Sequence, residues 1–128
     1  MKPAVAATLS LTLMLFSTLV LSSEVPFNQA QFDATRAAGK PVAVVFHANW
    51  CPTCRAQAPV LKELAQTQEL QPVTLYIADF DTENGLKKSL GVTKQSTIVV
   101  FKNGREIARS TGDTQQDPLA ALLRHAIS

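Results

Sequence analysis

The sequence has few cysteine, histidine, tryptophan and tyrosine residues and little net charge. Cysteine and histidine occur twice each, and tryptophan and tyrosine once each, in 128 residues. The 12 basic and 10 acidic residues nearly balance, and no stretch interleaves basic with aromatic side chains, so we expect no nucleic acid partner. A glycine-rich phosphate loop and a Ser/His/Asp pattern are also absent. These absences exclude nucleotide-binding and serine-hydrolase chemistry of the usual kinds.

The length allows one domain. About a hundred residues remain once an N-terminal segment is set aside, which is enough for a single hydrophobic core. Repeats, low-complexity tracts and interdomain linkers are absent from the sequence. We therefore expect residues 1–23 to form a leader and residues 24–128 to form one folded domain, which should be a monomer.

The N-terminal segment has the composition of a secretory signal peptide. Lys2 is followed by 18 uncharged residues, Ala4 to Leu21, and then by Ser22 and Ser23, which are small enough for cleavage. The uncharged run is slightly shorter than the ~20 residues of a membrane-spanning helix, so a retained inner-membrane anchor stays open as the alternative. It contains no cysteine, which excludes a lipoprotein anchor. Lys2 should stay on the inner side, so both alternatives predict a periplasmic or otherwise exported domain.

The two cysteines lie where a strand is expected to give way to a helix. The apolar, valine-rich run over residues 41–47 predicts a strand buried on both faces, and Cys51 follows it at a turn. Pro52 stands at the first helical position, where a missing N–H costs nothing. Cys51 and Cys54 then share one helix face with Cα atoms roughly 5 Å apart, so a disulfide between them can form and break without refolding.

Cys51 is the expected nucleophile of this pair. The helix N-terminus offers the backbone N–H groups of Thr53 and Cys54 and the positive end of the helix dipole, and both favour a thiolate. A disulfide across so short a loop restrains little of the unfolded chain, so it is a poor structural staple. An exported domain with two cysteines ordinarily suggests one structural disulfide, but this spacing favours a redox-active pair.

The segment 50–54, Trp-Cys-Pro-Thr-Cys at a strand-to-helix junction, resembles the active site of the thioredoxin-like family. Pro59 stands where that family kinks its active-site helix. Residues 102–104, Lys-Asn-Gly, look like the family's hairpin turn, and Gly112 follows at the usual distance. The resemblance covers roughly residues 28–127. It implies an α/β fold, a three-layer sandwich in which helices flank a central mixed sheet.

The same resemblance implies a thiol-disulfide oxidoreductase that acts on protein disulfides. Its only cofactor would be the disulfide formed by Cys51 and Cys54. Residues 50–56 are also similar to the motif of membrane-tethered thioredoxin-like proteins of cytochrome c maturation, which favours reduction with electrons from a membrane partner. Relatives span about −270 to −120 mV, so the oxidase and isomerase directions stay open.

The remaining elements follow from periodicity and turn signals. Helices are expected over residues 28–38, 52–69 and 82–90, with a last helix capped by Asp117 and Pro118. The other strands are expected over residues 73–79, 97–101 and 105–110, and Asn103-Gly104 between the last two predicts a hairpin. The first two strands should run parallel through a right-handed crossover.

One departure from the family pattern concerns the proton on Cys54. The family's buried acid, six residues before the first cysteine, is Val45 here, and its lysine partner aligns with Ile77. His47 lies two residues after Val45 on the same strand face. It either shuttles the proton of Cys54 or simply packs beside Trp50, which is expected to cover the site and contact substrates.

A second departure is Ser96, which stands where the family has a cis-proline beside the active-site sulfurs. A cis bond before a non-proline residue costs about 3 to 4 kcal/mol, so we expect a trans bond. The serine hydroxyl either lies near the thiols or is a neutral substitution. The missing ring leaves room for a metal ion, so the alternative function is a periplasmic Cu(I)- or Zn(II)-binding module that uses Cys51, Cys54 and His47. The preferred interpretation includes no metal site.

Overall fold

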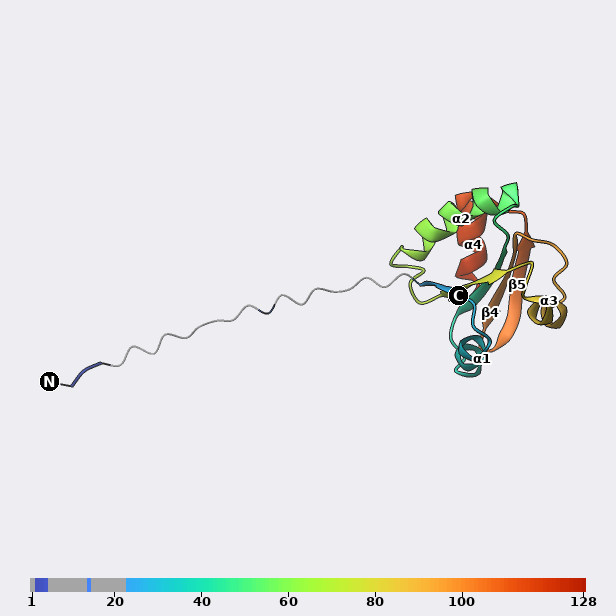
Figure 1. The fold of residues 1–128 in the computed structure, drawn as a ribbon. Coiled ribbons are helices and arrows are strands. Elements are labelled where there is room, and N and C mark those ends of the chain that lie inside the picture. Colours follow the sequence, from blue (N-terminus) through green and yellow to red (C-terminus); the bar gives the residue numbers. More distant parts are fainter. Residues whose placement is uncertain (1, 5–13, 15–22) are drawn as a thin grey trace.

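The computed structural model describes residues 2–4, 14 and 23–128 (Figure 1). The leader predicted over residues 1–23 falls almost wholly outside these ranges, so both alternatives for it remain predictions. Within the ranges described, no helix is long and apolar enough to cross a membrane.

Within residues 23–128, five strands form one mixed sheet in the order β1-β3-β2-β4-β5. The strands β1, β3 and β2 run parallel, whereas β4 is antiparallel to both β2 and β5. This arrangement confirms the predicted α/β fold with a central mixed sheet and the parallel pairing of the first two predicted strands. The strand bounds are β1 (Glu24–Pro26), β2 (Val42–His47), β3 (Thr74–Asp79), β4 (Thr97–Lys102) and β5 (Arg105–Thr111).

In the part of the chain that the structure describes, four helices complete the three layers (Figure 1). Their bounds are α1 (Gln29–Ala37), α2 (Pro52–Ala65), α3 (Asn84–Leu90) and α4 (Gln116–Arg124). The alternating residues of β2 separate two cores: Val44 and Phe46 pack with residues of α1 and α3, while Ala43 and Val45 pack with residues of α2 and α4. Both faces of the strand that leads to the cysteines are therefore buried, as its unbroken apolar run predicts.

The α1 helix supplies an aromatic side chain to one of these cores. Asn28 caps the helix, because its Oδ1 accepts a hydrogen bond from the backbone N–H of Gln31 at 3.0 Å. One turn later Phe32, which is 1% exposed, packs at steep angles against Tyr76 and Phe101. The helix is thereby fixed to the sheet face opposite α2.

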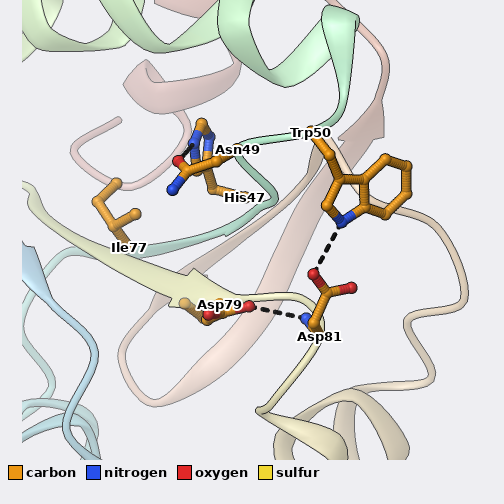
Figure 2. A pocket seen from close by; sticks show the side chains of 7 residues that line it. His47, Asn49, Trp50, Ile77, Asp79 and Asp81 are labelled. Atoms are coloured by element: carbon orange, nitrogen blue, oxygen red, sulfur yellow. Dashed lines mark hydrogen bonds between the residues drawn. The ribbon is translucent and has the colours of Figure 1, made fainter.

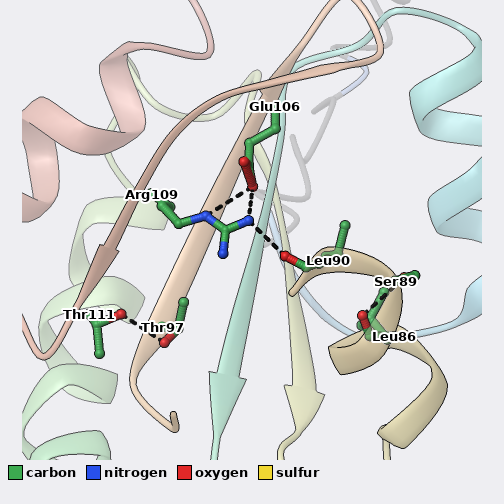
Figure 3. A network of polar contacts seen from close by, with 7 residues as sticks. All are labelled: Leu86, Ser89, Leu90, Thr97, Glu106, Arg109 and Thr111. Atoms are coloured by element: carbon green, nitrogen blue, oxygen red, sulfur yellow. Dashed lines mark hydrogen bonds and ion pairs between the residues drawn. The ribbon is translucent and has the colours of Figure 1, made fainter. Parts of the chain in front are cut away.

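The hairpin between β4 and β5 has the predicted two-residue loop. Lys102 pairs with Arg105, and the intervening Asn103 and Gly104 have φ angles of 53° and 79°. Positive φ at both positions is the geometry that Asn-Gly favours. Further along the hairpin, Arg109 contacts Glu106 and donates to the Leu90 carbonyl at 2.7 Å, which ties β5 to the end of α3 (Figure 3).

The strand β1 was not predicted from the sequence. This strand has only three residues and no alternation of its own, and it is held by pairing with β3. Leu75 donates its N–H to the Ser23 carbonyl at 2.8 Å, and Phe27 donates to the Ile77 carbonyl at 2.9 Å. Contacts this distant in sequence leave no local pattern to read.

Three predicted helix ends were also wrong. The α2 helix ends at Ala65, four residues early, because both the N–H and the hydroxyl of Thr67 bond to the Leu64 carbonyl and close the last turn. The α3 helix begins two residues late, at Asn84. The α4 helix begins at Gln116 with Gln115 as its cap, so Asp117 lies inside the first turn instead of capping it.

Candidate active site

The site begins where β2 ends and the chain turns into α2. Cys51 is the N-cap residue of α2, and its Sγ accepts a hydrogen bond from the backbone N–H of Cys54 at 3.3 Å. Pro52 occupies the first helical position, as predicted. Both cysteines are free thiols, with exposed fractions of 4% for Cys51 and 0% for Cys54. Cys51 is therefore the sulfur that a partner can reach.

The surroundings of Cys51 favour its thiolate. Burial raises the pKa of the thiol, but hydrogen bonds from the backbone N–H and the side chain of Cys54, from the Ser96 hydroxyl and from the Thr53 N–H outweigh it and lower the pKa to about 7. These donors include the backbone N–H groups at the helix N-terminus that the sequence analysis named. A large fraction of Cys51 is thus ionised near neutral pH.

The pKa of Cys54 moves in the opposite direction. Burial of its sulfur raises the pKa, and hydrogen bonds from Ser96 and the Ala48 backbone lower it only in part, while the neighbouring Cys51 raises it further. The two thiols therefore separate into an ionised outer sulfur and a protonated inner one. The inner thiol must lose its proton before it can attack a disulfide.

We expect alkylation of Cys51 by iodoacetamide to rise as the pH increases through about 7 and to level off above it. At pH 6 an ordinary cysteine would carry roughly thirtyfold less thiolate. The lower nucleophilicity of a less basic thiolate offsets part of this gain, so the rate should be several-fold above that of free cysteine. Mass spectrometry that locates the label on Cys51 in peptides of the wild-type protein follows this one thiol, and a midpoint above pH 8 would contradict the expectation.

Ser96 brings its hydroxyl to both sulfurs. The oxygen lies 2.8 Å from Cys54 Sγ and 3.6 Å from Cys51 Sγ. The peptide bond before Ser96 is trans, as expected, and the residue has a φ of 59°. Its backbone N–H donates to the Phe46 carbonyl at 2.8 Å, and its carbonyl accepts from the Gly112 N–H at 3.0 Å. A proline could not donate the first of these bonds.

Replacing Ser96 by alanine should move the midpoint of Cys51 alkylation upward by roughly half to one pH unit, because a hydrogen bond that stabilises the thiolate is lost. The pH profile of iodoacetamide labelling measures the change. The Ser89→Ala variant is the matched control, since Ser89 bonds to the Leu86 carbonyl within α3. An unmoved midpoint would show that the hydroxyl does not act on the thiolate.

Trp50 lies on the surface beside the cysteines. Its side chain is 58% exposed, and its Nε1 donates to Asp81 Oδ2 at 2.8 Å (Figure 2). The Asp81 backbone N–H in turn donates to Asp79 Oδ1 at 2.8 Å. The indole is therefore held in one orientation with an exposed face. Asp81 was missed as a site residue, and its only sequence signal is its place in an acidic loop after β3.

His47 ends β2 and is half-buried. Its Nε2 lies 2.9 Å from Asn49 Oδ1, and the imidazole borders an open cavity of about 220 Å³ that Trp50 also lines (Figure 2). The two family positions that are apolar here, Val45 and Ile77, are register partners on β2 and β3. Because both positions are apolar here, the family's acid and its lysine partner are absent together. Neither charge is left buried without its partner.

Gln57 is a second residue that the sequence analysis missed. It is 1% exposed, and its side-chain amide donates to the Asp113 carbonyl at 2.8 Å and to the Ser96 carbonyl at 3.3 Å. This side chain holds the Ser96 loop against α2. The signal was present, because Gln57 lies three residues after Cys54 and four before Leu61, on the buried face of the helix.

The ligands of the metal-binding alternative do not gather. Among the residues that the structure describes, no three His, Cys, Asp or Glu side chains lie together as a metal ion would require. His47 contacts Asn49, and Cys51 and Cys54 contact Ser96. In the described part of the chain, His47 is thus not gathered with the two cysteines into a group of three ligands.

Comparison with known proteins identifies the family. The model of the family described as Thioredoxin matches residues 23–125. This chain belongs to the thioredoxin family. It is 36% identical to a thioredoxin of Chlamydia muridarum over 96 residues, 75% of this chain and 91% of that protein. It is 34% identical to a thioredoxin of Mycobacterium tuberculosis over 119 residues, 93% of this chain and 86% of that one.

Solved structures agree with the thioredoxin assignment. The crystal structure of Trxlp from Edwardsiella tarda shares 33% identity with a TM-score of 0.75, over 78% of this chain and 96% of that one. The Malassezia sympodialis thioredoxin shares 25% identity with a TM-score of 0.73, over 82% of this chain and 94% of that one. The predicted family and fold are confirmed, and the chain is a thioredoxin-family thiol-disulfide oxidoreductase with Cys51 and Cys54 as its CxxC pair.

Proposed function

We propose that this thioredoxin-family protein is exported and that it reduces or exchanges disulfides in partner proteins of the periplasm. Support for export comes from the sequence, where Lys2, an uncharged run and Ser22-Ser23 precede the domain. Support for the reaction comes from one arrangement: Cys51, with its pKa lowered to about 7, borders an open cleft of about 230 Å³, while Cys54 is fully buried behind it.

The order of attack follows from this arrangement. The Cys51 thiolate attacks one sulfur of the partner disulfide, and the other partner sulfur leaves as a thiolate that takes a proton from solvent. Cys54 then loses its proton and attacks Cys51 Sγ, and the second partner sulfur leaves as a thiolate that also takes a proton from solvent. The partner gains two electrons and two protons, and the protein is left with a Cys51–Cys54 disulfide.

The cleft beside Cys51 provides room for the partner chain. Besides Cys51, the cleft is lined by Thr53 of α2, by residues 94–96 and by Thr111 and Gly112. Backbone groups of Ser96 are already used within the protein, by Phe46 and Gly112. A bound segment must therefore find its contacts at Gln95, at the exposed Trp50 and at the rim of the cleft.

Turnover in an exported compartment requires re-reduction of the disulfide. Such compartments oxidise thiols, so a reductase there needs an electron donor in the membrane. We propose a membrane-bound dithiol as this donor and reduction as the physiological direction. The similarity of residues 50–56 to membrane-tethered relatives of cytochrome c maturation supports this direction.

The Cys54→Ser variant should accumulate mixed disulfides with partner proteins in cells. Without the resolving thiol, the bond between Cys51 and the partner persists, and adducts should appear on non-reducing gels and disappear after reduction. The Cys51→Ser variant is the control and should form none. Adducts should occur in the periplasmic or membrane fraction.

Two outcomes would contradict the proposal. Adducts confined to the cytoplasmic fraction would exclude export. Absence of adducts together with tight Cu(I) or Zn(II) binding by the reduced protein would favour the metal-binding module.

A further inference from the structure

A small cavity lies beneath the active-site helix. Its volume is about 90 Å³, and Val45, Ile77 and Gln57 are among the residues that line it. Two titratable side chains also line it, Glu24 from β1 and His47 from β2. A water molecule needs roughly 15 Å³ and two or more polar partners. The cavity therefore has the space and the polar groups to hold several water molecules.

The two apolar residues that replace the family's charged pair line this same cavity. Val45 and Ile77 are neighbours across β2 and β3, and neither can accept a proton. Glu24 lies one strand further out, on β1, where it is paired in register with Leu75. The Glu24 carboxyl of β1 thus lines the same cavity as Val45 and Ile77, which themselves provide no charged group.

The surroundings of Glu24 suit proton uptake. Burial raises the pKa of its carboxyl, and Lys62 on α2 and His47 on β2 lower it in part. On β3, Leu75, which is in register with Glu24, and Ile77, two residues further along, are apolar. A carboxylate with a raised pKa is a better base near neutral pH than an ordinary one. Lys62 and His47 both act on the charge of this carboxyl.

Cys54 is linked to the lining of this cavity through both α2 and β2. Gln57 is one helical turn after Cys54 on α2. The Phe46 carbonyl, 4.0 Å from Cys54 Sγ, belongs to the residue between Val45 and His47 on β2. The α2 helix and the β2 strand, which both contribute residues to the cavity wall, are therefore the elements that connect Cys54 with the cavity.

We propose that Glu24, through His47 and water in this cavity, takes up the proton that Cys54 loses when it resolves a mixed disulfide. The S–H bond of Cys54 breaks as its sulfur bonds to Cys51 Sγ, and the proton ends on the Glu24 carboxylate. The bond from Cys51 to the partner sulfur breaks, and that sulfur leaves with the electron pair as a thiolate that takes a proton from solvent. It returns to solvent through the larger cavity beside Trp50, because His47 and Ile77 line both cavities. This inference rests on the proposed exchange reaction.

Stopped-flow reaction with 5,5′-dithiobis(2-nitrobenzoate) separates the two steps. The first thiolate release reports attack by Cys51, and the second reports attack by Cys54. In the Glu24→Gln variant we expect the second phase to slow by about tenfold or more between pH 6 and 7, with the difference closing above pH 9, and the first phase to stay unchanged. Glu63→Gln, an exposed acid on α2, is the matched control.

Two further variants test the route. Glu24→Asp keeps a carboxyl and should restore part of the lost rate, whereas a purely structural role would leave the pH profile of the second phase unaltered in every variant. His47→Phe should slow the same phase over the same pH range. A second phase with the wild-type rate and pH profile in Glu24→Gln would overturn the proposal. Absence of both phases in the wild-type protein would instead refute the exchange reaction.

A measurement on the wild-type protein decides the case if the variants fail to fold. Carbon-13 NMR of the glutamate carboxyl groups follows Glu24 directly. We expect Glu24 to titrate above the ordinary range, with different midpoints in the reduced protein and in the Cys51–Cys54 disulfide form. An ordinary midpoint that is the same in both forms would overturn the proposal.

Discussion

Replacing Cys51 by serine should lower the rate of protein disulfide reduction by at least about three orders of magnitude, since the nucleophile itself is removed. A serine hydroxyl is not ionised at neutral pH and does not exchange with disulfides. Cys54 cannot take its place, because it is 0% exposed and its pKa is raised by burial. The remaining activity should equal the rate without protein.

The measurement is turnover of a disulfide-containing protein with dithiothreitol as the electron source. Circular dichroism and thermal unfolding of Cys51→Ser must match the wild type, which serine, similar in size to cysteine, should allow. The Cys54→Ser variant provides the contrast, because it should lose turnover but keep the first attack. Retention of more than about one hundredth of the wild-type rate in Cys51→Ser would refute the assignment of the nucleophile.

Replacing Phe32 by alanine should cost about 3 to 5 kcal/mol of unfolding free energy, a large part of the roughly 5 to 15 kcal/mol of a typical domain. The ring is 1% exposed, and its centroid lies 5.6 Å from that of Phe27 and 5.5 Å from that of Phe101. The Arg36 guanidinium also lies over the Phe101 ring, 4.5 Å from its centroid. The substitution would leave a cavity that these neighbours cannot fill.

Urea denaturation monitored by circular dichroism measures this loss. Phe32→Leu is the control and should cost less, because it keeps most of the buried volume. The cysteines belong to a different cluster from Phe32, so alkylation of Cys51 in the folded Phe32→Ala protein should keep its midpoint. A loss below about 1 kcal/mol would show that α1 is not fixed by this ring.

The elements that the sequence predicts well are those whose signals are local. The unbroken apolar run of β2 and the Asn103-Gly104 turn each depend on residues within a few positions, and both were placed correctly. The strand β1 depends on pairing with β3, about fifty residues away along the chain, and it was missed. Helix ends failed for a related reason, since the turn that closes α2 at Ala65 uses the Thr67 hydroxyl rather than a recognised stop residue.

The same distinction applies to the active site. The spacing of Cys51 and Cys54 and the proline between them are local, so the sequence indicates the pair and the identity of its outer thiol. The partners Asp81, Gln57 and Glu24 come from other elements or from a buried helix face, and their roles emerge only once β1, α2 and β3 are assembled. The directions of the two thiol pKa values likewise follow from burial and from the Ser96 hydroxyl, which lies 42 residues beyond Cys54 in the chain.

The direction of β1 determines how the domain would face a membrane. Because β1 runs parallel to β2, the described chain enters the sheet at its amino end, beside Leu75, whereas the cysteines follow the carboxyl end of β2. Anything attached ahead of Ser23 is therefore joined at the rim opposite the thiols. A tether at that rim would hold the domain with its reactive sulfur turned outward, free to meet large partners that approach from the aqueous side.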